Sequence, residues 1–194
     1  MATNPTRRLE ILDAAIDVLA DTGIGGLTHR QVDARVELPL GTTSNYFRTR
    51  LALLEATAGR VVDLHWQTVS VVQDVIGPVQ GRAGLVALIA RMLGEPDAAA
   101  RRRYAARFEL FLEGTRRPEL LPFLNDLQEA SMKTARVIMQ AAGLSASDEK
   151  VGEMSRLING LAFSNTTLSK DMPGGQDPAG LADRLVTAVL GIPE

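Results

Sequence analysis

The sequence contains no cysteine, few aromatic residues and no long apolar run. Without cysteine among its 194 residues, the chain cannot form a disulfide, a thiolate nucleophile or a cysteine-ligated zinc or iron–sulfur site. Phenylalanine, tryptophan and tyrosine together make up only 4% of it. No apolar run is long enough to span a bilayer, and the first residues do not have the regions of a signal peptide. We therefore expect a soluble, cytoplasmic protein with no membrane partner.

Neither sign of charge is in large excess. The formal net charge is −2, and charged residues make up 23% of the chain. Such a balance gives no general attraction to nucleic acid, so any such binding depends on local charge. With 45% hydrophobic residues, the composition is that of an ordinary globular protein and excludes disordered and collagen-like classes.

Helical periodicity runs through the whole chain. Leu9, Leu12, Ile16 and Leu19 recur at the spacing of one helical face. Asn4 and Pro5 supply a cap and a first-turn proline before them, and Gly23 offers a stop. Because no segment alternates with period two for long, we predict an all-α fold. The further expected helices cover residues 28–36, 40–47, 49–76, 81–93, 97–116, 118–142, 147–169 and 177–190.

The segment 27–56 carries the most informative motif. Two short helices are separated there by a turn of a few residues, which is the geometry of a helix-turn-helix. A Thr-x-Arg pair lies on the first short helix, Gly-Thr begins the second, Tyr-Phe ends it, and a basic residue precedes the next helix. These positions are Thr28, Arg30, Gly41, Thr42, Tyr46, Phe47 and Arg50. In this pattern the segment resembles the DNA-binding domain of the TetR family of bacterial transcriptional regulators, over roughly the first sixty residues.

The resemblance implies a division of labour along the chain. Residues 1–50 would form a three-helix, helix-turn-helix DNA-binding domain, and residues 51–194 a helical effector-binding and dimerisation bundle. The expected function is that of a homodimeric repressor, released from a palindromic operator in double-stranded DNA by a small apolar effector. No metal, cofactor or enzymatic activity is expected.

The residue types of the second short helix suit the major groove of DNA. This groove is about 12 Å wide and admits a helix whose leading residues are small. Asn45 can read adenine, Thr43 and Ser44 can bond base edges or touch a thymine methyl, and Arg30 can reach guanine. Phosphate contacts are expected from polar and basic side chains and from free amides at the helix start. The full expected DNA-binding set is Thr28, Arg30, Gly41, Thr42, Thr43, Ser44, Asn45, Tyr46 and Arg50.

Several of these residues also have simpler interpretations. Thr28 can be a plain N-cap, and an arginine such as Arg30 can be a solvated surface charge. Phe47 is expected in the core in any case. Arg7 and Arg8 could touch DNA or belong to a frayed terminus.

Three positions depart from the family pattern. Asp33 and Glu37 bring negative charge to the helix-turn-helix, and Glu37 replaces a glycine that typically ends the helix in a left-handed conformation. Ser44 stands where many members have an aromatic residue that touches the DNA backbone. These departures keep open a second hypothesis, in which the chain is a helical ligand-binding or adaptor protein that does not bind DNA.

Bulky side chains of the C-terminal part could line an effector cavity. The candidates are aromatic residues and one asparagine within otherwise apolar stretches. Ordinary core packing is the alternative for each of them. Asn159 and Asn165 could orient a polar group of the effector or make a hydrogen bond between helices. The expected ligand-binding set is Trp66, Tyr104, Phe108, Phe111, Asn159 and Phe163.

Apolar stripes on the last two expected helices indicate a dimer interface. Members of the family usually pair these helices with their mates across a two-fold axis, forming a four-helix bundle. Burial within one subunit is the alternative. The expected interface set is Leu157, Leu161, Leu168, Leu181, Leu185 and Val189.

The sequence gives little support to an enzymatic function. The two histidines do not have a metal-binding spacing, and no glycine-rich loop has a phosphate-cradling pattern. Glu109 and Glu113 share a helical face and could form a carboxylate pair. Ion pairs with arginines such as Arg107 and Arg116 explain them more simply.

Overall fold

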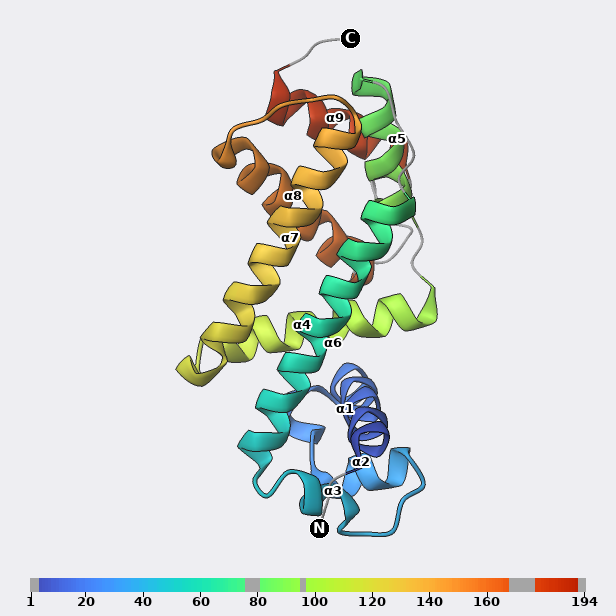
Figure 1. Cartoon of the computed structure of the whole chain (residues 1–194), viewed down its shortest axis with the longest axis vertical. Coiled ribbons are helices and arrows are strands. Elements are labelled where there is room, and N and C mark those ends of the chain that lie inside the picture. The colour runs from blue at the N-terminus through green and yellow to red at the C-terminus, as the bar shows by residue number, and fades with distance from the viewer. Residues whose placement is uncertain (1–3, 76–80, 95–96, 168–176, 192–194) are drawn as a thin grey trace. The chain divides into compact units, whose positions relative to one another are not determined.

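The structure, a computed structural model, describes residues 4–75, 81–94, 97–167 and 177–191, and these ranges contain helices and no strand. The all-α prediction is confirmed. None of the helices in the described ranges is long and apolar enough to cross a membrane. In chain order (Figure 1) the elements are α1 (Pro5–Gly26), α2 (His29–Arg35), α3 (Thr42–Tyr46), α4 (Arg50–Val75), α5 (Gly81–Leu93), α6 (Ala98–Gly114), the 3-10 helix η1 (Pro118–Leu120), α7 (Leu121–Ala141), α8 (Asp148–Thr167) and α9 (Pro178–Leu190).

Contacts divide the chain into two compact units. Unit 1 comprises Met1–Leu64 and Ala98–Leu127, and unit 2 comprises His65–Asp97 and Gln128–Glu194. Helices α4 and α7 contribute residues to both units. This division is based on contacts between residues. The expected boundary after residue 50 separates DNA binding from effector binding instead, and it stays a prediction.

Unit 1 is built on α1. The Asn4 side chain accepts bonds from the amides of Thr6 (3.0 Å) and Arg7 (3.2 Å), and Pro5 occupies the first turn. Gly23, at φ 66°, interrupts α1 at the position where the sequence predicted its end, but helical residues continue to Gly26. Helix α1 packs against α2 and α6. Its buried face carries Ile11, Leu12, Ala14, Ala15, Ile16, Val18 and Leu19.

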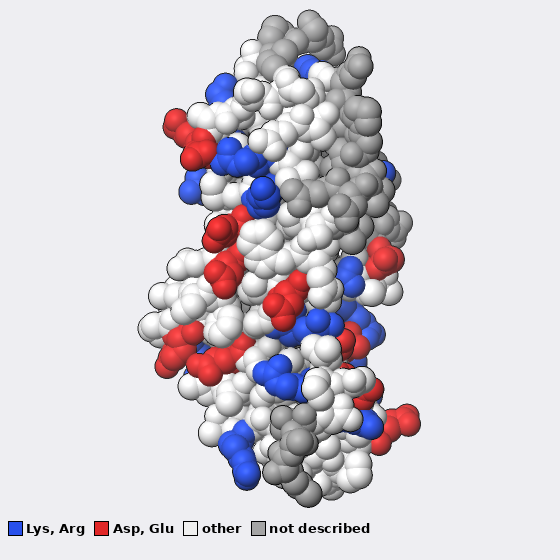
Figure 2. All heavy atoms as spheres, viewed as in Figure 1, with Lys and Arg blue, Asp and Glu red and all other residues white. Residues whose placement is uncertain are grey.

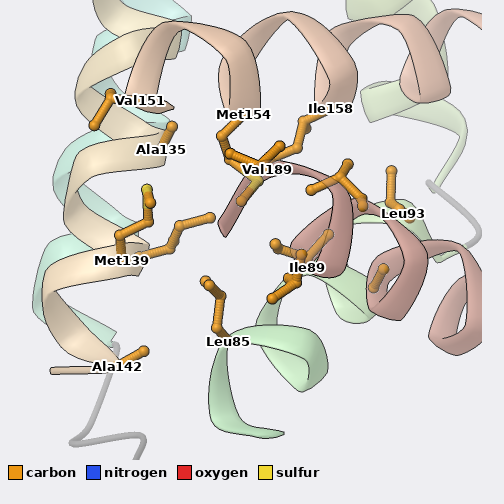
Figure 3. Close-up of a cluster of buried hydrophobic side chains, with 14 residues drawn as sticks. Leu85, Ile89, Leu93, Ala135, Met139, Ala142, Val151, Met154, Ile158 and Val189 are labelled. Carbon is orange, nitrogen blue, oxygen red and sulfur yellow. The ribbon is translucent and has the colours of Figure 1, made fainter. Parts of the chain in front are cut away.

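Unit 2 has its own apolar core, drawn in Figure 3. It is formed by buried residues of α5, α7, α8 and α9, among them Leu85, Met139, Met154 and Val189. Helix α9 packs against α5 and α8. Arg82 on α5 reinforces the packing by an ion pair with Asp183 of α9 (2.7 Å). Each unit therefore buries an apolar core of its own.

Candidate nucleic-acid interface

Local sequence signals place the helix-turn-helix of unit 1. The Thr28 side chain caps α2 by accepting a bond from the Gln31 amide (3.3 Å). Gly41, in the left-handed conformation at φ 91°, is the N-cap of α3. Thr49 then accepts a bond from the Ala52 amide (3.0 Å) at the start of α4. Figure 1 shows α2 and α3 beside α1 in this unit.

Asp33 clamps the start of α3 onto α2. Its side chain is buried, and one carboxylate oxygen accepts bonds from the Thr43 amide (2.7 Å) and the Thr43 hydroxyl (2.6 Å). The other oxygen accepts a bond from the Gly41 amide (2.8 Å). Bonds to a carboxylate are about twice as strong as neutral ones. Asp33 therefore fixes the orientation of α3, the helix expected to enter the major groove and called the recognition helix below, relative to α2.

The bonds of Asp33 correct three expectations. Thr43 has no exposed surface and its hydroxyl is bonded to Asp33, so it does not present a group to DNA bases and is instead a positioning residue. The amides at the start of α3 are not free, because Asp33 binds those of Gly41 and Thr43, and the Pro39 carbonyl accepts a bond from the Thr42 amide (3.1 Å). Because Asp33 is buried, it also does not add negative charge to the exposed surface.

Glu37 adopts the conformation that its position requires. Its φ is 55°, and among described residues other than glycine it alone has a positive φ. The left-handed region costs a side chain with a Cβ about 1–2 kcal/mol. The expected strain at this turn is therefore present.

The remaining expected DNA contacts lie outside the core. Arg30, Gly41 and Asn45 are exposed, while Thr28, Thr42, Ser44 and Tyr46 are half-buried. The Thr42 hydroxyl donates to the Pro39 carbonyl (2.6 Å) and the Ser44 hydroxyl to the Gly41 carbonyl (2.8 Å). A phosphate oxygen can only accept, so a Thr42 bond to phosphate would require its hydroxyl to turn from Pro39. Of these residues, Arg30 and Asn45 expose side chains with the donors that base edges need.

Arg50 has a structural role beside its expected phosphate contact. Its Nε donates to the Leu27 carbonyl (2.9 Å), and Nη2 bonds the carbonyls of Ile24 and Gly25. The guanidinium therefore satisfies carbonyl groups at the end of α1 that have no partner within the helix. The contact of Arg50 with a phosphate stays a prediction.

The structure gives roles to three further residues of this region, of which the sequence had indicated only Arg8. His29 Nε2 lies 2.6 Å from the Phe47 carbonyl, linking α2 to the end of α3. The Arg8 guanidinium lies 5.2 Å from the centre of the buried Phe47 ring, so Arg8 belongs to an ordered helix and brings positive charge next to α3. Leu40, before Gly41, is 76% exposed. The sequence signal that could have identified Leu40 is the presence of an apolar residue in the turn just before α3.

Figure 2 shows lysine and arginine side chains interspersed with aspartate and glutamate on the face drawn. Within unit 1, Arg35 of α2 pairs with Asp21 of α1 (2.7 Å), and Arg60 of α4 with Asp13 (2.7 Å). These pairs hold α2 and α4 to α1, so their arginines do not contribute an unpaired positive charge.

The expected ligand-binding residues fall in both units. Trp66, Asn159 and Phe163 belong to unit 2, and Tyr104, Phe108 and Phe111 to unit 1. In unit 1 the Tyr104 and Phe108 rings stack with centroids 6.2 Å apart. In unit 2 Phe163 is 46% exposed. For Asn165 the structure decides between the two alternatives, since its amide donates to the Leu93 carbonyl at the end of α5 (2.9 Å). The ligand-binding set itself stays a prediction.

The expected dimer stripes separate into buried and accessible residues. Leu185 and Val189 are buried in the core of unit 2, so their assignment to an interface is wrong and the alternative, burial within one subunit, applies. Leu161 and Leu181 are partly buried against the same core. Leu157 is 40% exposed on α8. Leu168 lies outside the described residues.

The carboxylates considered for catalysis have structural partners. Glu109 accepts a bond from the Ile24 amide (3.2 Å). Glu113 forms ion pairs with Arg116 (3.3 Å) and Arg117 (2.5 Å). The hydrogen bond from Arg117, helped by the charges of both arginines, lowers the pKa of Glu113 although its burial opposes this shift. The geometry therefore agrees with a structural role for the two carboxylates.

Comparisons with known proteins agree with this architecture. Residues 80–192 match the family of the tetracyclin repressor-like C-terminal domain. The transcriptional regulator BetI of Paraburkholderia phytofirmans is 36% identical over 64 residues, which are 33% of this chain and 33% of BetI. The match thus spans only about a third of the curated relatives' length.

Two solved structures cover nearly the whole chain. A transcriptional regulator from Rhodococcus sp. Rha1 superposes with a TM-score of 0.74 at 16% identity, covering 98% of this chain and 100% of that one. The multidrug binding protein EbrR, complexed with ethidium, superposes with a TM-score of 0.66 at 27% identity, covering 94% and 99%. BetI and the Rhodococcus protein are transcriptional regulators and not enzymes. With its C-terminal domain matched over 80–192 and its helix-turn-helix in place, the chain belongs to the TetR family of transcriptional regulators.

Proposed function

We propose that the protein is a transcriptional repressor that binds a palindromic operator as a homodimer and releases it when a small apolar effector binds. The observation that carries the proposal is that α2 and α3 are held together by buried hydrogen bonds on one side and expose polar side chains on the other. Asp33 and Thr43 are buried and fix the recognition helix, whereas Arg30 and Asn45 are exposed. A rigid support below exposed hydrogen-bonding side chains suits the reading of base edges.

The burial of Asp33 also weakens the competing hypothesis of an adaptor that has lost DNA binding. That hypothesis depended in part on Asp33 as a negative charge on the DNA-facing surface. With Asp33 enclosed and bonded to three donors, the exposed basic residues Arg8, Arg30 and Arg48 face fewer carboxylates. Leu40 adds an exposed apolar side chain of the kind that contacts a thymine methyl.

A dimer is proposed because one recognition helix reads too few base pairs alone. Two copies related by a two-fold axis would read half-sites about one helical turn of DNA apart, roughly 34–36 Å, or a multiple of this distance. On α8, Leu157 of the expected interface set is an exposed large apolar side chain of unit 2. It suits a surface that a second copy covers.

The proposed effector is a small apolar molecule. EbrR, which shares this fold, is a multidrug binding protein, and this supports an effector of that broad kind here. Helix α4 carries Arg50 at its start and Trp66 further along, so a ligand near Trp66 would act on the helix that follows the recognition unit. Binding of effector and operator would then be reciprocally coupled, typically by about 1–3 kcal/mol.

Selection of bound sequences from random duplex DNA tests the proposal directly. The expected result is a site with dyad symmetry, bound with an affinity that falls steeply with salt because counterions are released. Recovery of no enriched sequence, or of sites without a dyad, would contradict a repressor of palindromic operators.

Two matched variants then separate reading from positioning. Asn45→Ala should relax the preference at one base pair per half-site, at about 1–3 kcal/mol, if Asn45 binds its base bidentately. Tyr46→Phe removes only a hydroxyl and should weaken operator and random DNA equally, because phosphates carry no sequence information. Equal effects of both variants on operator and random DNA would show that Asn45 does not read a base.

A further inference from the structure

A small pocket lies within unit 1, apart from the residues expected to bind the effector. It has a volume of about 230 Å³. Its walls come from the end of α1 and the link to α2, from the first turns of α4, and from the segment between α6 and η1. The lining residues are Ile24, Leu27, Arg50, Leu51, Leu54 and Arg117.

The lining combines an aliphatic wall with two cations. Four of the six residues are isoleucine or leucine, of which Leu27 and Leu54 are almost fully buried, and both charged residues are arginines. No carboxylate is among the described residues that line it. An apolar cavity with a few convergent polar groups is the usual form of a small-molecule site, and its two guanidiniums favour an anionic group on the ligand.

Both arginines are held in place while keeping donors available. Arg50 is anchored to the carbonyls of Ile24, Gly25 and Leu27 through Nε and Nη2. Arg117 donates from Nε to Glu113. Since a guanidinium carries five N–H donors, the bonds described leave the Nη1 donors of both residues and the Nη2 donors of Arg117 for a ligand.

The neighbouring acidic groups cancel this charge only in part. Glu113 is shared between Arg116 and Arg117, and Glu109 accepts a bond from the Ile24 amide. Three guanidiniums therefore stand against two carboxylates around the pocket, and both carboxylates already have donors.

We propose that this pocket is a binding site for a small carboxylic acid with an aliphatic chain. At roughly 30 Å³ for each unit the size of a water molecule, the volume accommodates about eight such units. A chain of about that length can cover Leu27, Leu51 and Leu54 while its carboxylate reaches Arg117. Arg50 lines the pocket and is also an expected phosphate contact, so the site shares one residue with the proposed DNA-binding surface. Binding of the acid is measured without DNA, so its failure can be distinguished from a failure of the proposed repressor function.

Octanoate is the probe, with octan-1-ol and acetate as controls that lack the charge or the chain. Calorimetric titration of the full chain without DNA should show saturable binding of octanoate and much weaker binding of both controls. Methyl NMR signals of Leu51 and Leu54 should shift with the same affinity. Octan-1-ol that binds as tightly as octanoate, or no octanoate binding at millimolar concentration, would overturn the proposal.

Two variants with the same charge change locate the site. Arg117→Gln should weaken octanoate binding about tenfold, the effect of one charge-assisted hydrogen bond. Arg91→Gln, on the exposed surface of α5 in unit 2, should leave binding unchanged. Equal affinities of the Arg117 variant and the parent, or methyl shifts that spare Leu51 and Leu54, would refute the assignment. The methyl shifts of the parent decide the question even if the Arg117 variant does not fold.

Discussion

Replacement of Asp33 tests whether this residue supports the recognition helix or merely adds charge to its surface. Asp33→Ala removes the acceptor of three donors, two of them on the fully buried Thr43. A buried donor left without a partner costs about 1–3 kcal/mol. The two Thr43 donors therefore predict a loss of about 2–6 kcal/mol in the free energy of unfolding, a large share of the roughly 5–15 kcal/mol typical of a domain.

The two explanations predict opposite changes in DNA affinity for Asp33→Asn. The asparagine oxygen can still accept from Thr43, but its NH2 group would meet the Gly41 amide, so two donors face each other. The clamp predicts weaker DNA binding for this variant, whereas a surface charge would predict tighter binding because a negative charge is lost. Thr43→Val is the matched control, since it removes one hydroxyl bond and leaves the Thr43 amide bonded to Asp33.

Urea unfolding, amide hydrogen exchange of Gly41 and Thr43, and DNA affinity measure these effects together. The expected order of stability is wild type, Thr43→Val, Asp33→Asn and Asp33→Ala, with faster exchange at both amides in the Asp33 variants. A loss below about 0.5 kcal/mol in Asp33→Ala, the range of an ordinary surface substitution, would refute the clamp. Tighter DNA binding by Asp33→Asn would refute it independently.

Further predictions concern strain, pH and assembly. Glu37→Gly should raise the free energy of urea unfolding by about 0.5–1 kcal/mol, because glycine has no Cβ penalty at φ 55°; no gain would mean that the turn is unstrained. Because folding lowers the pKa of Glu113, this residue stabilises the fold at pH values above its ordinary pKa of 4.5. The contribution is lost as the pH falls through the pKa of Glu113 in the folded protein. The stability difference between wild type and Glu113→Gln should therefore shrink in urea titrations below about pH 4.5, and a difference independent of pH would contradict the Arg117 pairing. Leu157→Glu should produce monomers in sedimentation experiments. The control Leu112→Glu, on the exposed face of α6 in unit 1, should remain a dimer. A dimer of the Leu157→Glu variant would refute the proposed interface on α8.

Local sequence signals determined where helices begin and end. Asn4 and Thr28 cap α1 and α2 as their positions predicted, and Gly23 interrupts α1 where the sequence predicted its end. The burial of Phe47 also follows from sequence. Each of these features depends on side chains and backbone groups within a few residues, so the information lies in a short window of the chain.

The tertiary structure decided which residues of other helices each side chain contacts. Asp33 and Thr43 are ten positions apart, and only the turn between α2 and α3 brings the carboxylate to the amide and hydroxyl. Leu185 and Val189 have the spacing of an apolar stripe, which shows that one helical face is buried but not what covers it. The carbonyl groups at the end of α1 likewise meet Arg50 only after α4 has packed beside them. Periodicity and caps act within one helix, whereas hydrogen bonds between helices depend on how the turns direct them, and therefore the sequence alone determined the helices but not the clamp on the recognition helix.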